Sequence, residues 1–102
     1  AEPLVGDADC ELVKREVSAT PAEFVRGLRD AFPEDLTGGG QRFRIARDGA
    51  VLDIVVTPGP DRVIAGLRLP TVQVCIRLDG PGLAARARLL RRLDLATHRG
   101  GG

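Results

Sequence analysis

The chain has 102 residues, of which 43% are hydrophobic and 28% are charged, and its net charge is +1. These proportions are typical of one folded domain spanning residues 1–102, and they exclude an intrinsically disordered chain. Apolar stretches fall far short of the roughly 20 residues of a membrane helix, and no signal peptide begins the chain. We therefore expect no membrane partner. The expected location is the cytoplasm, and the alternative is export with a signal peptide that has been removed.

The basic residues are strongly biased toward arginine. Lys14 is the only lysine among 15 basic residues, and Asn, Tyr, Trp and Met are absent. GC-rich codons encode this bias, which indicates a high-GC bacterium. Because arginine then stands where lysine stands in other proteins, arginine richness is weak evidence for nucleic-acid binding. Cys10 and Cys75 match neither a CxxC motif nor a zinc pair, so we expect reduced thiols, or one disulfide if the chain is exported.

The first elements follow from local patterns. Residues 1–9 mix Pro, Gly and acid without a period and are expected to form a flexible arm. Residues 10–19 alternate as a strand with Val13, Arg15 and Val17 on one face. The sequence T-P-A-E at 20–23 is a capping box that predicts a helix from Pro21. Pro33 ends this helix, whose apolar face includes Phe24 and Phe32 as core anchors.

The middle of the chain predicts a run of strands. Residues 33–40, PEDLTGGG, are expected to be a mobile loop because three glycines follow one another. Four strands are then predicted at 41–47, 50–57, 61–69 and 71–78. Asp48-Gly49 predicts a two-residue type I′ turn, since both positions require positive φ. A four-stranded antiparallel meander is the simplest topology for these strands.

A second helix is predicted from Pro81 to the glycine-rich end, where residues 99–102 form a flexible tail. Its apolar stripe comprises Ala85, Leu89, Leu90, Leu93 and Ala96. Arg86 lies inside the stripe, and we expect its guanidinium to extend to the edge and reach water. The resulting order, β-α-β-β-β-β-α, predicts an α+β two-layer sandwich with both helices on one face of an antiparallel sheet.

That architecture leaves the other face of the sheet uncovered, which we term the open face. We predict that it forms a concave surface for an anionic ligand or a protein partner, or a dimer interface to which Val51, Val55 and Ile64 add apolar area. Period-2 alternation places Asp53 on this face, and a buried pair with Arg15 or Arg68 is the alternative. The predicted surface residues are Arg42, Arg44, Asp53, Gln73, Cys75 and Arg77.

Catalytic and metal chemistry find little support in the residue pattern. Ser18 is the only serine and His98 the only histidine, and His98 lies near the end of the second helix. Candidate metal ligands are scattered along the chain, so we expect no metal and no cofactor. The glycines of TGGGQR lack the GK[ST] ending of a phosphate-binding loop. We therefore predict that the protein is not an enzyme.

Three functions remain as hypotheses. The first is a small non-catalytic binding or self-association module, in which the partner is a protein or a second copy. The second is a nucleic-acid-binding domain that uses a basic helix face with Arg88, Arg91 and Arg92, although no Tyr or Trp is present to stack on bases. The third is a small enzyme that uses Asp53 or a cysteine at an unrecognised site.

Overall fold

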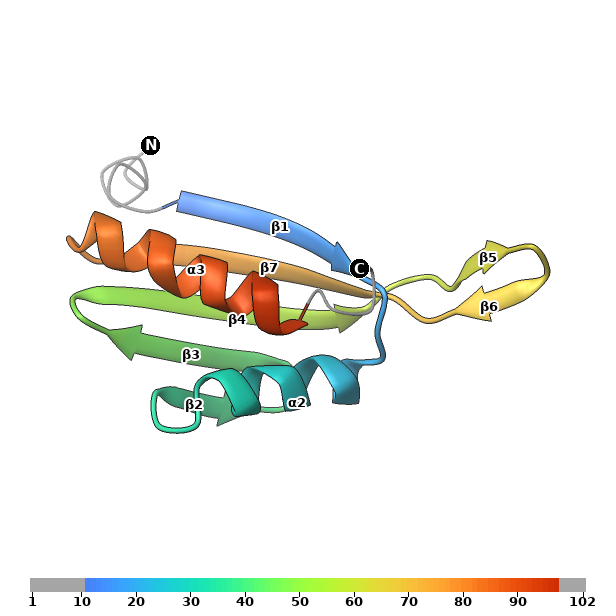
Figure 1. Cartoon of the computed structure of the whole chain (residues 1–102), viewed down its shortest axis with the longest axis horizontal. Coiled ribbons are helices and arrows are strands. Elements are labelled where there is room, and N and C mark those ends of the chain that lie inside the picture. Colours follow the sequence, from blue (N-terminus) through green and yellow to red (C-terminus); the bar gives the residue numbers. More distant parts are fainter. Residues whose placement is uncertain (1–10, 98–102) are drawn as a thin grey trace.

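The computed structural model describes residues 11–97, which form a five-stranded antiparallel sheet, a separate two-stranded hairpin and two helices (Figure 1). The predicted α+β class is confirmed. The expected arm and tail, together with Cys10 and His98, lie outside the described residues. The elements in chain order are β1 (Glu11–Val17), α2 (Pro21–Ala31), β2 (Leu36–Gly39), β3 (Arg42–Arg47), β4 (Ala50–Pro58), β5 (Arg62–Ile64), β6 (Leu67–Leu69), β7 (Val72–Asp79) and α3 (Leu83–Thr97).

Both helices lie over the same face of the sheet, as predicted (Figure 1). The strand order is β1-β7-β4-β3-β2. Strands β4 and β7 supply alternate side chains to the interior, because successive residues of a strand point to opposite faces. The core is therefore one layer between sheet and helices, and its buried apolar residues are Val17, Phe24, Leu28, Phe32, Phe43, Ile45, Ala50, Leu52, Ile54, Val56, Val72, Val74, Ile76, Leu78, Ala85, Leu89 and Leu93. Among residues 11–97, no helix has the length and apolar character to cross a membrane.

The capping box at the start of α2 is confirmed. The backbone N–H of Glu23 donates to the Thr20 hydroxyl at 3.1 Å, and the Thr20 N–H donates to the Glu23 carboxylate at 2.9 Å. These bonds satisfy two amide groups that a helix N-terminus leaves without partners. Phe24 and Phe32 are each 1% exposed, so both are core anchors as expected.

The turn between β3 and β4 is also confirmed. Asp48 and Gly49 have φ of 54° and 80°, which are the positive values that a type I′ turn needs. The flanking residues Arg47 and Ala50 are paired, and the two strands run antiparallel. This register fixes which side chains of β3 and β4 are neighbours on the open face.

The four-stranded meander is wrong at its third strand. Residues 61–69 do not form one strand; they fold back as the hairpin β5–β6 around Ala65 and Gly66, whose φ values are 52° and 82°. Strand β4 consequently pairs directly with β7, from Val51 opposite Asp79 to Pro58 opposite Val72. The missed signal is the interior glycine, because a glycine within a strand pattern often marks a turn or bulge.

The predicted loop at 33–40 is wrong for half of its length. Leu36–Gly39 pairs with Arg42–Ile45 as the edge strand β2. Gly38 has φ of 106°, and a Cβ there would collide with the backbone of Arg42 and Phe43. The glycines that suggested mobility therefore permit a close approach between two paired strands.

Helix α3 begins at Leu83 rather than at Pro81, because residues 80–82 pack against the β3–β4 turn. The N–H of Gly82 donates to the carbonyl of Gly49 at 3.1 Å. The prediction for Arg86 is also wrong: the residue is 8% exposed, and its Nε donates to the Gly80 carbonyl at 2.9 Å. Its guanidinium stays inside and holds the β7–α3 connection instead of reaching water.

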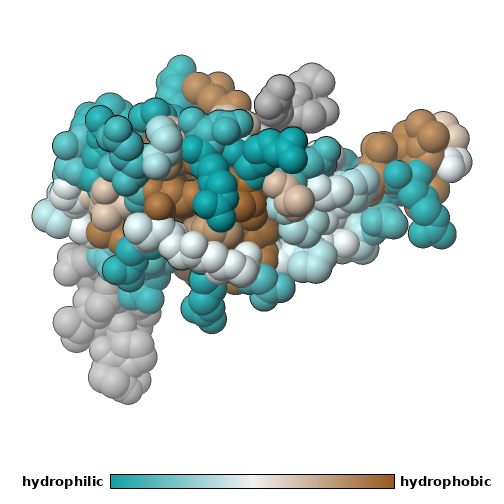
Figure 2. Space-filling model, turned by 90° about the horizontal axis from the view of Figure 1, so that it is seen from below, coloured by the Kyte–Doolittle hydropathy of each residue, from teal (hydrophilic) through white to brown (hydrophobic). Residues whose placement is uncertain are grey.

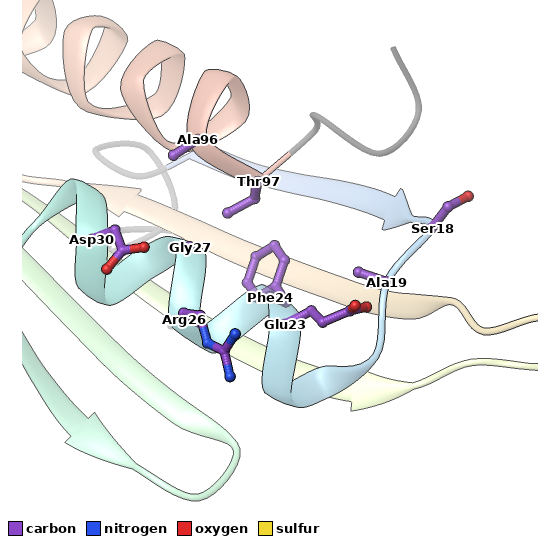
Figure 3. Close-up of a pocket in the computed structure, with 9 residues that line it drawn as sticks. All are labelled: Ser18, Ala19, Glu23, Phe24, Arg26, Gly27, Asp30, Ala96 and Thr97. Atoms are coloured by element: carbon purple, nitrogen blue, oxygen red, sulfur yellow. The ribbon is translucent and has the colours of Figure 1, made fainter.

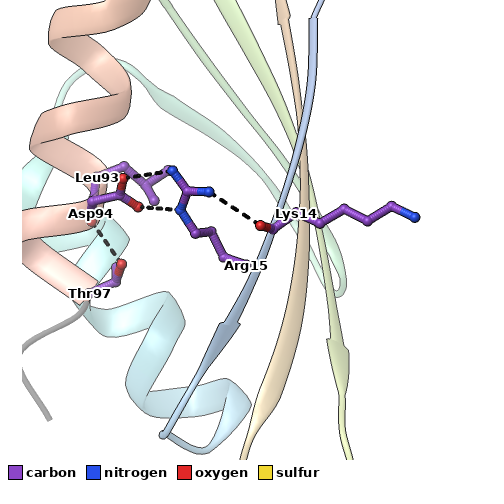
Figure 4. A network of polar contacts seen from close by, with 5 residues as sticks. All are labelled: Lys14, Arg15, Leu93, Asp94 and Thr97. Atoms are coloured by element: carbon purple, nitrogen blue, oxygen red, sulfur yellow. Dashed lines mark hydrogen bonds and ion pairs between the residues drawn. The ribbon is translucent and has the colours of Figure 1, made fainter. Parts of the chain in front are cut away.

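An ion pair joins the edge of the sheet to the helix layer (Figure 4). Arg15 of β1 donates two hydrogen bonds to the Asp94 carboxylate of α3, each 3.2 Å long. A third bond, from Arg15 to the Lys14 carbonyl, orients the guanidinium. Strand β1 pairs along only one side, with β7, so this contact gives the edge strand a second attachment.

Candidate functional site

The open face carries the residues that the sequence predicted for a ligand or partner surface. Pairing between strands places Asp53 of β4 between Arg44 of β3 and Arg77 of β7. The neighbouring row places Val55 between Arg42 and Cys75. All six lie on the side away from the helices, since their strand neighbours are the buried core residues.

Asp53 lies on the open face, as the alternation predicted, and it forms an ion pair there with Arg44. Its carboxylate accepts hydrogen bonds from Arg44 Nε at 2.7 Å and from the second guanidinium nitrogen at 3.4 Å. These hydrogen bonds and the carboxylate charge raise the pKa of Arg44 above its ordinary value. The alternative buried pair with Arg15 or Arg68 is wrong, because those arginines pair with Asp94 and Asp61.

A hollow of about 470 Å³ opens on this face. Gln73 and Val51 are predicted open-face residues that are not part of its lining; Gln73 lies further along β7, opposite Glu16 and Thr57. Ile64 does not contribute to the open face, because it lies on the β5–β6 hairpin. The lining comprises Leu12, Gly38, Arg42, Phe43, Arg44, Asp53, Ile54, Val55, Cys75 and Arg77.

Two of the hollow's three arginines have no charged partner in the described structure. Arg42 and Arg77 make no ion pair and no side-chain hydrogen bond within residues 11–97, whereas Arg44 is engaged by Asp53. The hollow therefore holds three guanidinium groups against one carboxylate. This excess favours an anion over a cation as its occupant.

Within residues 11–97, the structure does not bring the candidate nucleophiles Ser18 and Cys75 together. Cys75 is a half-buried free thiol in the open-face hollow, while Ser18 lines a different pocket beside α2. Nucleophilic catalysis needs a base within hydrogen-bond reach of the nucleophile. Within residues 11–97 there is also no cluster of three His, Cys, Asp or Glu side chains that could hold a metal ion.

Ser18 belongs to a pocket of about 380 Å³ between α2, the β1–α2 connection and the end of α3 (Figure 3). The pocket separates the end of α3, at Ala96 and Thr97, from the first turns of α2. The buried ring of Phe24 forms its floor. Glu23 and Arg26 stand at its rim, and Glu23 is already engaged in the capping box. No sequence pattern predicted this pocket, because its walls come from separate segments.

The predicted basic helix face is present on α3. Arg88, Arg91 and Arg92 are exposed, and together with Leu95 and Ala96 they border a shallow hollow of about 520 Å³. Arg92 also stacks over the Phe32 ring, with 5.1 Å between its central guanidinium carbon and the ring centroid. None of these three arginines forms an ion pair with the residues that the structure describes.

The hairpin β5–β6 is another feature that the sequence patterns did not predict. It projects from one end of the molecule, and apolar surface gathers on it (Figures 1 and 2). Every residue of both strands is exposed. The exposed fractions are 61% for Val63, 50% for Ile64, 65% for Leu67 and 36% for Leu69. Residues 61–69 were predicted as one sheet strand between turns, and that prediction did not indicate an apolar projection.

Comparisons with protein-family models, curated proteins and solved structures gave no significant match.

Proposed function

We propose that this domain is a non-catalytic interaction module that uses the β5–β6 hairpin to bind a protein chain, and that the chain is a second copy of the same protein. The observation that carries the proposal is the exposure of four large aliphatic side chains on a two-stranded projection. A two-stranded hairpin alone is marginally stable in water, because too little apolar surface is buried between its strands. A partner that covers this surface would stabilise the hairpin and the complex together.

A symmetric contact through the hairpin would contribute about as much free energy as association costs in entropy. Burying the exposed part of each aliphatic side chain contributes about 1 kcal/mol, or about 4 kcal/mol for one hairpin. A two-fold symmetric contact uses the same surface from both copies and so doubles this contribution. The resulting about 8 kcal/mol lies within the range estimated for the entropic cost of association, so further contacts beside the hairpin would set the affinity.

The charges of the hairpin favour a protein partner over a polyanion. Arg62 pairs with Glu16 of β1 at 3.1 Å, and Arg68 pairs with Asp61 at 3.7 Å. Both arginines are therefore already matched by carboxylates within the chain. The apolar side chains remain as the part of the hairpin that lacks a partner, and a partner of aliphatic character would match them.

The oligomeric state tests this proposal. Sedimentation velocity over a broad concentration range should show a dimer for the unaltered protein. The double variant Ile64→Ser, Leu67→Ser should shift it to monomer, because two exposed aliphatic groups are lost from the contact. The control is Leu83→Ser, Leu95→Ser, which removes leucines that are 68% and 71% exposed on α3. A monomer at every concentration, or a dimer lost equally in both double variants, would contradict the proposal.

Nucleic-acid binding is the second candidate, favoured by Arg88, Arg91 and Arg92 of α3, which form no ion pair within residues 11–97. The like charges of Arg88 and Arg92 repel at i and i+4, and a phosphate backbone would relieve this repulsion. The test is retention on DNA and RNA at increasing salt, comparing Arg88→Ala, Arg92→Ala with the control Arg62→Ala, Arg68→Ala. Steep salt dependence that is lost only in the α3 variant would support binding, and salt-independent or absent retention would remove it.

The expected setting for either activity is the cytoplasm of a high-GC bacterium. The arginine-biased composition favours that source, and a free Cys75 thiol is compatible with a reducing compartment.

A further inference from the structure

We propose that the open-face hollow binds a small organic acid with one carboxylate and an apolar body, at a site independent of the hairpin contact. The proposal starts from the charge of the lining. Arg42 and Arg77 have no partner within residues 11–97, while the third arginine is held by Asp53. An anion entering the hollow would meet two guanidinium groups whose hydrogen-bond donors are available.

The positions of these two arginines suit one small head group. Arg42 and Arg77 lie on β3 and β7 with only β4 between them, so about 10 Å separates their strands. Arg42 lies directly opposite Val55 of β4, and Arg77 lies opposite Asp53, the next residue of β4 on the same face. Arginine side chains are long enough to converge above β4, and a planar carboxylate matches the paired donors of a guanidinium.

The remaining lining explains why the ligand should have an apolar body. Leu12 of β1 is 66% exposed at the rim, and Val55 and Cys75 are half-buried side chains within the hollow. A volume of about 470 Å³ is within the usual range of small-molecule sites, which combine apolar walls with a few placed polar groups. Inorganic anions would leave these walls in contact with water and would gain nothing from them.

Asp53 limits the charge of the ligand. Its carboxylate lies in the same hollow, beside Arg77 in the strand register and bound to Arg44. A second negative charge on the ligand would be repelled by this group. The site therefore favours a monocarboxylate over a phosphate monoester, and an acid over the alcohol of the same chain length.

The test is a nuclear magnetic resonance titration of the amide signals with octanoate, using octan-1-ol and inorganic phosphate as comparison probes. Octanoate should give saturable shifts on β3, β4 and β7, and both comparison probes should bind there at least about tenfold more weakly. Arg42→Gln and Arg77→Gln should each weaken octanoate binding about tenfold or more. Arg91→Gln, an exposed arginine of α3, is the matched control and should leave it unchanged.

Several results would overturn the inference. One is the absence of saturable shifts on the open face, and another is octanol binding there as tightly as octanoate. Octanoate shifts confined to β5 and β6 would show nonspecific contact with the apolar hairpin instead. Because the hairpin variant Ile64→Ser, Leu67→Ser leaves the hollow intact, it should bind octanoate normally, which separates this proposal from the self-association proposal.

Discussion

Replacing Arg86 by Met tests whether a buried guanidinium stabilises the connection between β7 and α3. The side chain is 8% exposed and donates to the Gly80 carbonyl through Nε at 2.9 Å and through a second guanidinium nitrogen. Methionine keeps the apolar stem and its packing but removes these donors. The variant therefore isolates the hydrogen bonds from the aliphatic contacts.

The expected loss is about 2 kcal/mol of unfolding free energy. Hydrogen bonds from a charged donor contribute about 1.5–3 kcal/mol, and removing a buried charge returns part of this by avoiding its desolvation. At about 4–8 °C per kcal/mol for a domain of this size, the melting temperature should fall by about 10 °C. Thermal and urea denaturation followed by circular dichroism measure both quantities.

Arg88→Met is the matched control, because Arg88 is an exposed arginine two residues further along the same helix. Its substitution should change stability by no more than about 0.5 kcal/mol. Equal losses in the two variants would show that arginine contributes through general charge or helix propensity. A neutral Arg86→Met would show that the bonds to Gly80 do not stabilise the fold, and either result would refute the reasoning.

Three further experiments test local features of the fold by urea denaturation. Thr20→Ala should lower the free energy of unfolding by about 1 kcal/mol, because one hydrogen bond of the capping box is lost. An unchanged urea midpoint would contradict this prediction. Gly38→Ala should lower the free energy of unfolding by at least about 1 kcal/mol, because φ is 106° and the added Cβ would collide with the β3 backbone. The control Gly39→Ala should lower it less, because its Cβ would meet no atom. A double-mutant cycle on Arg15 and Asp94 should give a coupling of about 0.5 kcal/mol that falls with salt, since both groups are more than a third exposed; a salt-independent coupling would refute the exposed-pair interpretation.

The face on which each candidate-site residue lies could be predicted from the sequence, whereas its partner could not. Alternation within single strands was enough to place Asp53, Cys75 and Arg77 on the open face, because the side-chain period of a strand is two. The partner of Asp53 could not be predicted, since choosing among Arg44, Arg15 and Arg68 requires the pairing of strands. The hairpin was missed for a related reason, as Ala65 is not a residue typical of a type I′ turn and only Gly66 signalled it.

The sequence by itself determined the features that depend on neighbours a few residues apart. The capping box at Thr20, the Asp48-Gly49 turn and the alternation of β7 each follow from local hydrogen bonds, φ preferences or side-chain periodicity. Tertiary structure decided which strands pair and which side chains become buried. Leu36–Gly39 is a strand because it pairs with the edge of β3. Arg86 is buried because the β7–α3 connection places the Gly80 carbonyl within hydrogen-bond distance of its guanidinium. Such contacts depend on segments distant in sequence, so no local pattern contains them.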